Sequence, residues 1–414
     1  VDTLIVGQFL GKTALAAVGS SFALMTFLTS IMLGLCMGSG ALFSIRFGQR
    51  DEEGLRENIC ASFFFIAAAT AVLNLCAFLL LDLLQVLLQV PAEVWPDMRA
   101  YLFVIFWGIP AVFVYNFFAS FLRAVGNSVA PLIFLAASAV LNILLDLYFI
   151  LQLNRGVAGA AEATVIAQYV SGIGIAIYAM LRCPEVRSAI RPSCLRRMRV
   201  REIASFSVLT CIQQSIMNLG ILMVQGLVNS FGTITMAAFA AAVKIDAFAY
   251  MPVQDFGNAF STFIAQNYGA KQDARIRAGL KSAVSISMLF CIVVSVLVCV
   301  FASPLMKIFV DAGETEIIRE GVRYLRIEGV FYCGIGCLFL LYGLYRALAK
   351  PGMSVVLTVI SLGTRVVLAY ILSAIPAIGV VGIWWSVPIG WFLADVTGLV
   401  YFKLRKSELL TDSQ

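Results

Sequence analysis

The feature that most constrains this chain is a series of long apolar segments separated by short polar connections. A membrane-spanning helix needs about 20 predominantly apolar residues, because the hydrocarbon layer is ~30 Å thick and a helix rises ~1.5 Å per residue. We interpret eleven segments as spanning helices, namely Leu15–Ile45, Asn58–Leu84, Met98–Leu122, Ala130–Leu151, Gly159–Leu181, Ile203–Phe231, Met236–Gln266, Ala278–Phe301, Gly321–Arg346, Met353–Ser373 and Val380–Phe402. The sequence therefore predicts an all-α integral membrane protein.

Composition agrees with a membrane protein and excludes a soluble one. Hydrophobic residues make up 61% of the chain and charged residues 13%, against about 45–50% and about 25% in ordinary soluble domains. The mean hydropathy is +0.95. No soluble core could bury that much apolar surface.

The segment Val1–Leu10 looks like the end of one more helix. The chain begins with Val and not Met, so we expect that most of a first helix is missing, and we expect twelve helices in the natural protein. The length and sequence of the missing part stay open.

Cysteine and histidine usage limits the possible chemistry. The ten cysteines are scattered without the spacing of a disulfide framework or a zinc site. The chain contains no His, so proton chemistry must use carboxylates. No catalytic constellation is evident, so we expect no enzyme activity and no cofactor other than a coupling ion.

Basic residues gather in alternate connections between the segments. Cytoplasmic loops are richer in Lys and Arg, so this bias orients the helices. One set of connections, with the C-terminal tail, carries Arg46, Arg50, Arg56, Arg123, Arg182, Arg187, Arg191, Arg196, Arg197, Arg199, Arg201, Lys271, Arg275, Arg277, Lys281, Arg346, Lys350, Lys403, Arg405 and Lys406. The other set carries Lys12, Arg99, Arg155, Lys307, Arg319, Arg323 and Arg326. We expect a multi-pass protein of the plasma (cytoplasmic) membrane with both termini in the cytoplasm, and no nucleic-acid binding.

The longest polar interruption, at 183–201, divides the chain into two halves. We expect an N-terminal lobe at 1–182 with helices 1–6 and a C-terminal lobe at 202–406 with helices 7–12. Residues 183–201 are then a basic cytoplasmic connection, and residues 407–414 are a cytoplasmic tail.

The two halves are related in sequence. An offset of 221 aligns the segment from Phe9 with the segment from Ser230, and an offset of 223 aligns Arg123-Ala124 with Arg346-Ala347 and Gly156 with Gly379. A register held over so much of the chain indicates duplication, with a repeat axis along the membrane normal. Internal repeats are common in transporters, because two similar lobes can rock about a central site.

Three motifs in the right order resemble the multidrug and toxic compound extrusion (MATE) family. They are Val1-Asp2-Thr3 with Val6-Gly7, Leu10-Gly11 and Ala14–Gly19; Leu141–Asp146 with Gly156–Ala161; and Ala265–Ala270. The resemblance covers essentially the whole chain and is greatest to the bacterial DinF-like branch.

The resemblance implies a two-lobed exporter of organic, often cationic, compounds that is driven by inward flow of H+ or Na+. In this branch the cation site lies in the N-terminal lobe. Position by position, it falls on Asp2, Tyr101, Asn142, Asp146 and Thr164. A sodium ion would be held by the same residues without Tyr101.

Other branches of the family place acidic residues in the seventh and tenth helices. The corresponding segments here, Cys211–Met217 and Cys337–Tyr342, contain no acidic residue. An acidic site at these positions of the C-terminal lobe is therefore not expected.

The physical chemistry of Asn142 and Asp146 also indicates an ion-binding site, as the resemblance does. Their i, i+4 spacing places both on one helix face, and an unpaired charge at mid-bilayer costs about 2.5–3.5 kcal/mol on insertion scales. Oxygen atoms of Asn, Thr and Asp suit Na+, whereas a nearby Asp2 would favour a shared proton. The alternative is that Asp146 caps its helix at the interface near Asn154 and Arg155.

The repeat supplies a further argument. The offsets place Met223, Arg365, Ala369 and Val387 opposite Asp2, Asn142, Asp146 and Thr164. The second lobe thus lacks the oxygen cluster, which fits one lobe specialised for the coupling ion.

A second polar group interrupts the eighth helix. It comprises Lys244, Asp246 and Asp255, which could pair with Arg365 or Glu328. A structural ion-pair network and a substrate or proton route are both compatible with this pattern. Proline residues at 110, 252 and 388 are expected to kink their helices.

We therefore predict a multidrug antiporter that works by alternating access on drug-like small molecules, as a monomer among membrane lipids. A flippase for lipid-linked saccharides is the alternative, and it would favour a cationic central cavity and often extra helices. A membrane enzyme or a receptor lacks support in the motifs. The exported compound, its contact residues and the choice between H+ and Na+ stay open.

Overall fold

A computed structural model describes residues 5–6, 9–10, 12–83, 85, 93–189, 197–311 and 313–411. These residues form helices and connecting turns, and no strand occurs among them. The helices are α2 (Lys12–Gln49), α3 (Glu52–Leu79), α5 (Trp95–Phe106), α6 (Ile109–Ala124), α7 (Val129–Leu147), the π-helical η1 (Tyr148–Gln152), α8 (Gly156–Arg182), α9 (Pro184–Ser188), α10 (Arg197–Asn229), α11 (Thr233–Gly269), α12 (Asp273–Phe309), α13 (Thr315–Gly329), α14 (Tyr332–Ala347), α15 (Pro351–Ser373) and α16 (Val381–Thr411).

The helices account for the predicted spans. Nine helices of the described residues are long and apolar enough to cross a membrane, and two bent pairs raise the number to eleven. The pairs are α5 with α6 and α13 with α14. These eleven spans coincide with the eleven predicted segments, and the prediction of an all-α multi-pass membrane protein is confirmed.

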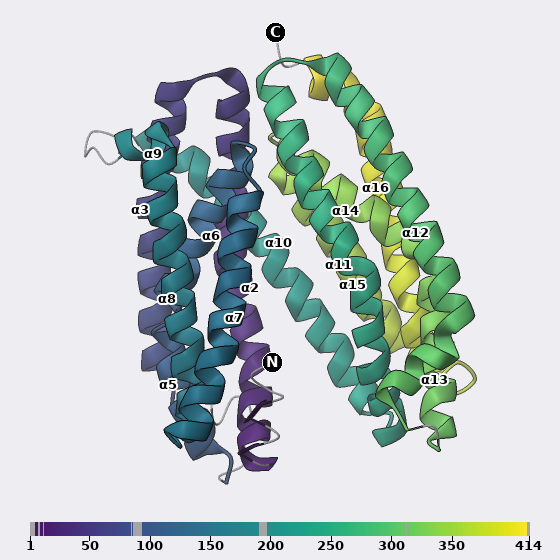
Figure 1. The fold of residues 1–414 in the computed structure, drawn as a ribbon. Coiled ribbons are helices and arrows are strands. Elements are labelled where there is room, and N and C mark those ends of the chain that lie inside the picture. The colour runs from purple at the N-terminus through teal and green to yellow at the C-terminus, as the bar shows by residue number, and fades with distance from the viewer. Residues whose placement is uncertain are drawn as a thin grey trace. The chain divides into compact units, whose positions relative to one another are not determined.

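The chain divides into two compact units, each a bundle of helices running side by side (Figure 1). The N-terminal unit comprises 1–47 and 51–211, and the C-terminal unit comprises 48–50 and 212–414. The division falls inside α10, whereas the sequence suggested the connection 183–201. In the N-terminal unit the first part of α10 packs on α2, where Ser39 and Ser207 are hydrogen-bonded at 2.9 Å and Arg46 pairs with Glu202 at 3.2 Å.

Backbone conformation confirms the repeat. Left-handed conformations recur at equivalent turns, at Arg50 and Lys271 with an offset of 221, and at Gly126 and Ala349 with an offset of 223. The pair Gly156 and Gly379 follows the same rule with an offset of 223. L-residues seldom adopt this conformation, so its recurrence shows that both halves keep the same turns.

One span is broken in each half. α5 and α6 meet at an angle of 44°, and α13 and α14 meet at 52°. Pro110 explains the first break, because proline cannot donate to the carbonyl four residues earlier. That carbonyl, on Phe106, accepts a hydrogen bond of 3.1 Å from the Asn74 side chain of α3. A side chain thus replaces the missing backbone donor, as the hydrocarbon layer requires.

Aromatic side chains fill the interior of both units. In the N-terminal unit Phe117 lies between Phe43 of α2 and Phe63 of α3, at ring-centroid distances of 5.9 and 5.3 Å. In the C-terminal unit the buried ring of Trp384 stacks on Phe239 at 5.4 Å. Such packing holds membrane helices together where lipid tails are as apolar as the core.

Candidate functional sites

The strongest candidate site lies in the N-terminal unit on α5, α7 and α8. α7 is mostly exposed, and its buried residues are Ala130, Pro131 and Asp146. Asp146 is 0% exposed. An acidic side chain is therefore turned into the protein from a helix whose other side chains largely face outward, which is the placement typical of functional intramembrane carboxylates.

Asn142 and Thr164, two of the residues that the resemblance implied, lie in contact with each other. The Asn142 Nδ2 donates to Thr164 Oγ1 at 3.2 Å, one turn before Asp146 on α7. The Thr164 hydroxyl in turn donates to the Ala160 carbonyl at 3.0 Å. These contacts fix the amide and the hydroxyl, and they present oxygen atoms that suit a hard cation.

The described surroundings of the site include Tyr101. This residue of α5 is 7% exposed and belongs to a buried cluster with residues of α8 and η1. The cluster also contains Ile5 and Val6. Asp2, which the resemblance placed in the site, lies outside the described residues.

The helix that carries Asp146 ends in an unusual turn. Tyr148–Gln152 continues α7 as a π-helix, and π-helical turns are frequent at functional sites. Arg155, which the alternative interpretation placed near Asp146, forms an ion pair with Glu162. Asp146 itself is completely buried.

The second polar group, which the sequence placed on α11 alone, has one buried member in the C-terminal unit. Asp246 of α11 is 8% exposed and accepts a hydrogen bond of 2.6 Å from the hydroxyl of Tyr332. Glu328 of α13 is 1% exposed and interacts with Asp246 and with Arg365 of α15. The structure thus joins Asp246, Arg365 and Glu328.

Lys244 and Asp255 lie apart from this buried group. Both are exposed on α11, and the ammonium of Lys244 lies 5.9 Å from the centroid of the Phe309 ring. No ion pair of either side chain is found among the described residues. Lys244 and Asp255, which the sequence grouped with Asp246, are therefore exposed on α11, whereas Asp246 is buried.

Two buried polar residues of the C-terminal unit were missed in the sequence. Asp395 of α16 is 8% exposed and lies near the thiol of Cys337 on α14. Arg346, which we assigned to a loop, is 5% exposed and donates to Asn258 at 3.0 Å and Ser261 at 3.3 Å. Asp395 interrupts an apolar stretch and could have been found by that signal.

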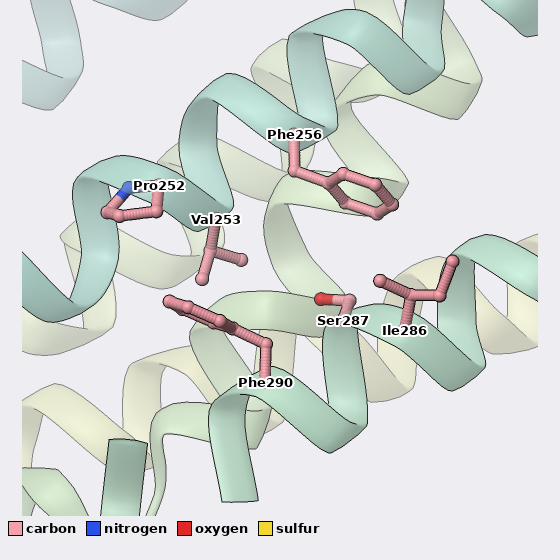
Figure 2. Close-up of a pocket in the computed structure, with 6 residues that line it drawn as sticks. All are labelled: Pro252, Val253, Phe256, Ile286, Ser287 and Phe290. Carbon is pink, nitrogen blue, oxygen red and sulfur yellow. The ribbon is translucent and has the colours of Figure 1, made fainter. Parts of the chain in front are cut away.

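The C-terminal unit also contains an apolar pocket of about 150 Å³ between α11 and α12. Figure 2 shows its lining, with the Ser287 hydroxyl directed into the space, and the residues are Pro252, Val253, Phe256, Ile286, Ser287 and Phe290. An apolar cavity of this size can hold a group as large as benzene. Its lining contains no charged side chain. The pocket therefore differs from the two candidate sites that contain Asp146 and Asp246.

No group of three or more His, Cys, Asp or Glu side chains that could hold a metal ion occurs among the described residues. A sodium ion at the N-terminal site would therefore depend on amide, hydroxyl and carboxylate oxygens together.

A family model described as MatE matches residues 1–148 and 207–371. The probable multidrug resistance protein YpnP of Bacillus subtilis (strain 168) is 28% identical over 410 residues, which cover 97% of this chain and 89% of that protein. The DNA damage-inducible protein F of Escherichia coli (strain K12) is 24% identical over 312 residues, which cover 71% of this chain and 65% of that protein.

Solved structures give the same fold. A crystal structure of MATE in the bent conformation matches with a TM-score of 0.90 at 23% identity, and the match covers 100% of this chain and 91% of that one. An outward-facing multidrug resistance MATE family transporter of the MOP superfamily matches with a TM-score of 0.89 at 22% identity, covering 99% of this chain and 91% of that one.

Proposed function

This chain belongs to the MATE family of multi-pass membrane transporters, and from that premise we propose that it exports drug-like organic compounds in exchange for inward H+ or Na+. Members of the family are transporters and not enzymes. The matched relatives include a probable multidrug resistance protein. Export of several chemically unrelated compounds, many of them cationic, is the activity we infer for this chain.

The observation that carries the ion coupling is the complete burial of Asp146 next to the Asn142–Thr164 hydrogen bond. A buried carboxylate beside amide and hydroxyl oxygens is suited to exchange a proton or a cation, because the surrounding membrane disfavours its charged form and the oxygens favour a bound ion. Binding of either ion changes the charge of the N-terminal unit. That change supplies the difference in free energy that an exchange mechanism needs between its states.

The duplicated architecture supports alternating access as the mechanism. Each half contains one broken span, and turns with the same backbone conformation recur at equivalent positions. Two similar halves can rock about a site and expose it to one side of the membrane at a time. We propose that the protein is a monomer of the plasma membrane, and the basic bias of its connections supports a cytoplasmic position of both termini.

The test is transport by the purified protein in sealed vesicles under separately imposed H+ and Na+ gradients. Efflux of an ethidium-type dye should follow one of the two gradients. Asp146→Asn keeps the size and hydrogen-bonding capacity of the side chain but removes its charge, so it should abolish gradient-driven efflux. Asp311→Asn, in an exposed turn between α12 and α13, is the matched control and should retain it.

Unchanged efflux by Asp146→Asn at equal insertion would contradict the assignment of the coupling site. Absence of dye movement in the native protein under both gradients would contradict the proposed exchange itself.

A further inference from the structure

The apolar pocket between α11 and α12 contains one buried hydroxyl that lacks a partner. Ser287 is 2% exposed, and its oxygen has no hydrogen-bond partner among the described residues. The thiol of Cys291 lies nearby, but a thiol is only a weak hydrogen-bonding group. Figure 2 shows the Ser287 hydroxyl directed into the space. Buried hydroxyl groups are nearly always paired, so a ligand with a donor or an acceptor would satisfy this one.

The pocket has a buried inner end and an exposed mouth. At the inner end Val253 is 4% exposed, and a Cβ added at Gly336 of α14 would lie 3.1 Å from the Ser287 Oγ and 3.6 Å from the Val253 Cγ1. At the mouth Ile286 is 53% exposed, and Pro252 is exposed as well. Because α12 is apolar and mostly exposed, a ligand dissolved in the hydrocarbon layer can reach the mouth.

The size and the lining of the pocket suit one aromatic ring. A dry apolar cavity of about 150 Å³ binds benzene, and this pocket has a volume of about 150 Å³. Figure 2 shows the ring of Phe256 from α11 and the ring of Phe290 from α12 on two sides of the Ser287 hydroxyl. The ring-to-ring contacts found in the described part of the C-terminal unit involve other residues. Both rings are thus available to pack against the ring of a ligand.

A lipid acyl chain is the competing occupant in a membrane. It would fill the apolar space, but it would leave the Ser287 hydroxyl buried without a partner, which is unfavourable. An aromatic ring with a hydroxyl or an amino group satisfies the apolar lining and the hydroxyl together. The lining contains no charged side chain, so the neutral form of such a ring fits best.

The other half of the protein fills the equivalent place. The offset of 221, which also relates the starts of α3 and α12, aligns Val253 with Met32 and Ser287 with Ile66. Met32 and Ile66 are 1% and 0% exposed and belong to the packed core of the N-terminal unit. The C-terminal unit has smaller residues at both positions, and one of them is polar. The shared fold therefore requires neither the space nor the hydroxyl.

We propose that the pocket is a binding site of the C-terminal unit for one neutral aromatic ring that carries a hydroxyl or an amino group. The ring packs against Phe256 and Phe290, and its polar group is hydrogen-bonded to Ser287. The site is separate from the candidate coupling site at Asp146, which lies in the other unit. Its biological meaning rests on the proposed export function, because such a ring can form part of a drug-like compound. Binding itself needs neither transport nor an ion gradient.

Fluorine NMR titration of the purified full chain in detergent, with para-fluorophenol and fluorobenzene as probes, tests this site. Empty micelles give the contribution of partitioning into detergent. The native protein should bind both probes saturably. The ratio of their dissociation constants should favour para-fluorophenol about threefold to tenfold more in the native protein than in Ser287→Ala, as expected for one net hydrogen bond. Comparison of the two ratios cancels the different partitioning of the probes.

The matched control is Ser285→Ala, which removes an exposed hydroxyl from the same helix and should keep the native ratio. A double variant, Val253→Met with Ser287→Ile, introduces the two residues of the other half. It should fill the pocket and abolish saturable binding of both probes. Its melting temperature shows whether it folds, and if it does not, the comparison of the native protein with Ser287→Ala decides.

Three results would overturn the proposal. They are the same ratio of dissociation constants in the native protein and Ser287→Ala, absence of saturable binding to the native protein, and tighter binding of fluorohexane than of para-fluorophenol, which would identify an acyl chain as the occupant. Saturable binding that persists in a folded double variant would also contradict the assignment to this pocket. Because these measurements use no gradient, their failure is distinguishable from failure of dye export.

Discussion

Thr164 is the residue of the N-terminal site whose chemistry can be changed with least change in shape. Its hydroxyl accepts from Asn142 at 3.2 Å, so Thr164→Val removes the oxygen and leaves the Asn142 amide without this partner. Loss of a hydrogen-bond partner in a buried site costs about 1–3 kcal/mol. We expect efflux at a limiting ion gradient to fall about tenfold or more, since 1.4 kcal/mol corresponds to a factor of ten.

The control for this prediction is Thr164→Ser, which keeps the hydroxyl. It should retain most of the efflux and the same dependence on the driving ion. Equal efflux of Thr164→Val and the native protein, measured in vesicles with a fixed gradient, would mean that the hydroxyl has no part in ion binding.

The sequence predicted which residues share a site where these residues lie on one helix. The cost of charge in a membrane singled out Asp146, and i, i+4 spacing placed Asn142 on the same face. The contact with Thr164 joins two helices and came only from the family resemblance. Asp246, Glu328 and Arg365 lie on three helices, and the sequence alone did not separate the buried Asp246 from the exposed Lys244 and Asp255 as a possible partner of Glu328 or Arg365.

The break between α5 and α6 depends on two residues that the sequence separates. Pro110 leaves the Phe106 carbonyl without a backbone donor, and Asn74 of α3 supplies a side-chain donor at 3.1 Å. Asn74→Leu should therefore lower the melting temperature in detergent. In a Pro110→Ala background the new backbone N–H can serve the Phe106 carbonyl, so the same substitution should have a smaller effect.

The native protein, Asn74→Leu, Pro110→Ala and the double variant form a double-mutant cycle, and the four proteins are compared by thermal unfolding. We expect a coupling free energy of about 0.5–3 kcal/mol, the range for residues that share a partner. Strictly additive effects would show that Asn74 does not compensate for the proline.

Proline predicted one of the two broken spans and could not predict the other. Pro110 stands at the start of α6, whereas the larger bend at Val330 contains no proline. At this bend α13 packs closely on α12, since a Cβ added at Gly329 would lie 3.2 Å from the Cys299 Sγ. Such a contact between helices leaves no periodic pattern in the sequence. The duplicated fold nevertheless implies a bend at the equivalent place of each half.

Duplication gives each turn a natural control in the other half of the protein. Gly126 and Ala349 occupy equivalent turns with φ of 90° and 57°. The left-handed conformation costs an L-residue about 1–2 kcal/mol, and no heavy atom lies within 4 Å of a Cβ built at Gly126. Gly126→Ala should therefore lower the melting temperature through backbone strain alone. Ala349→Gly should raise it, and a fall in both variants would contradict the argument.

Orientation in the membrane follows from charge distributed over the entire chain. The connection between α15 and α16, residues 374–380, contains no Lys or Arg, whereas the end of α16 carries Lys403, Arg405 and Lys406. Because basic connections remain in the cytoplasm, we expect fluorescence from a green fluorescent protein fused after Gln414. Alkaline phosphatase at the same place should be inactive, and the same enzyme inserted after Ala377 should be active. Active phosphatase after Gln414 would show that the orientation is the opposite of the predicted one. The ion gradient would then act on Asp146 in the opposite direction.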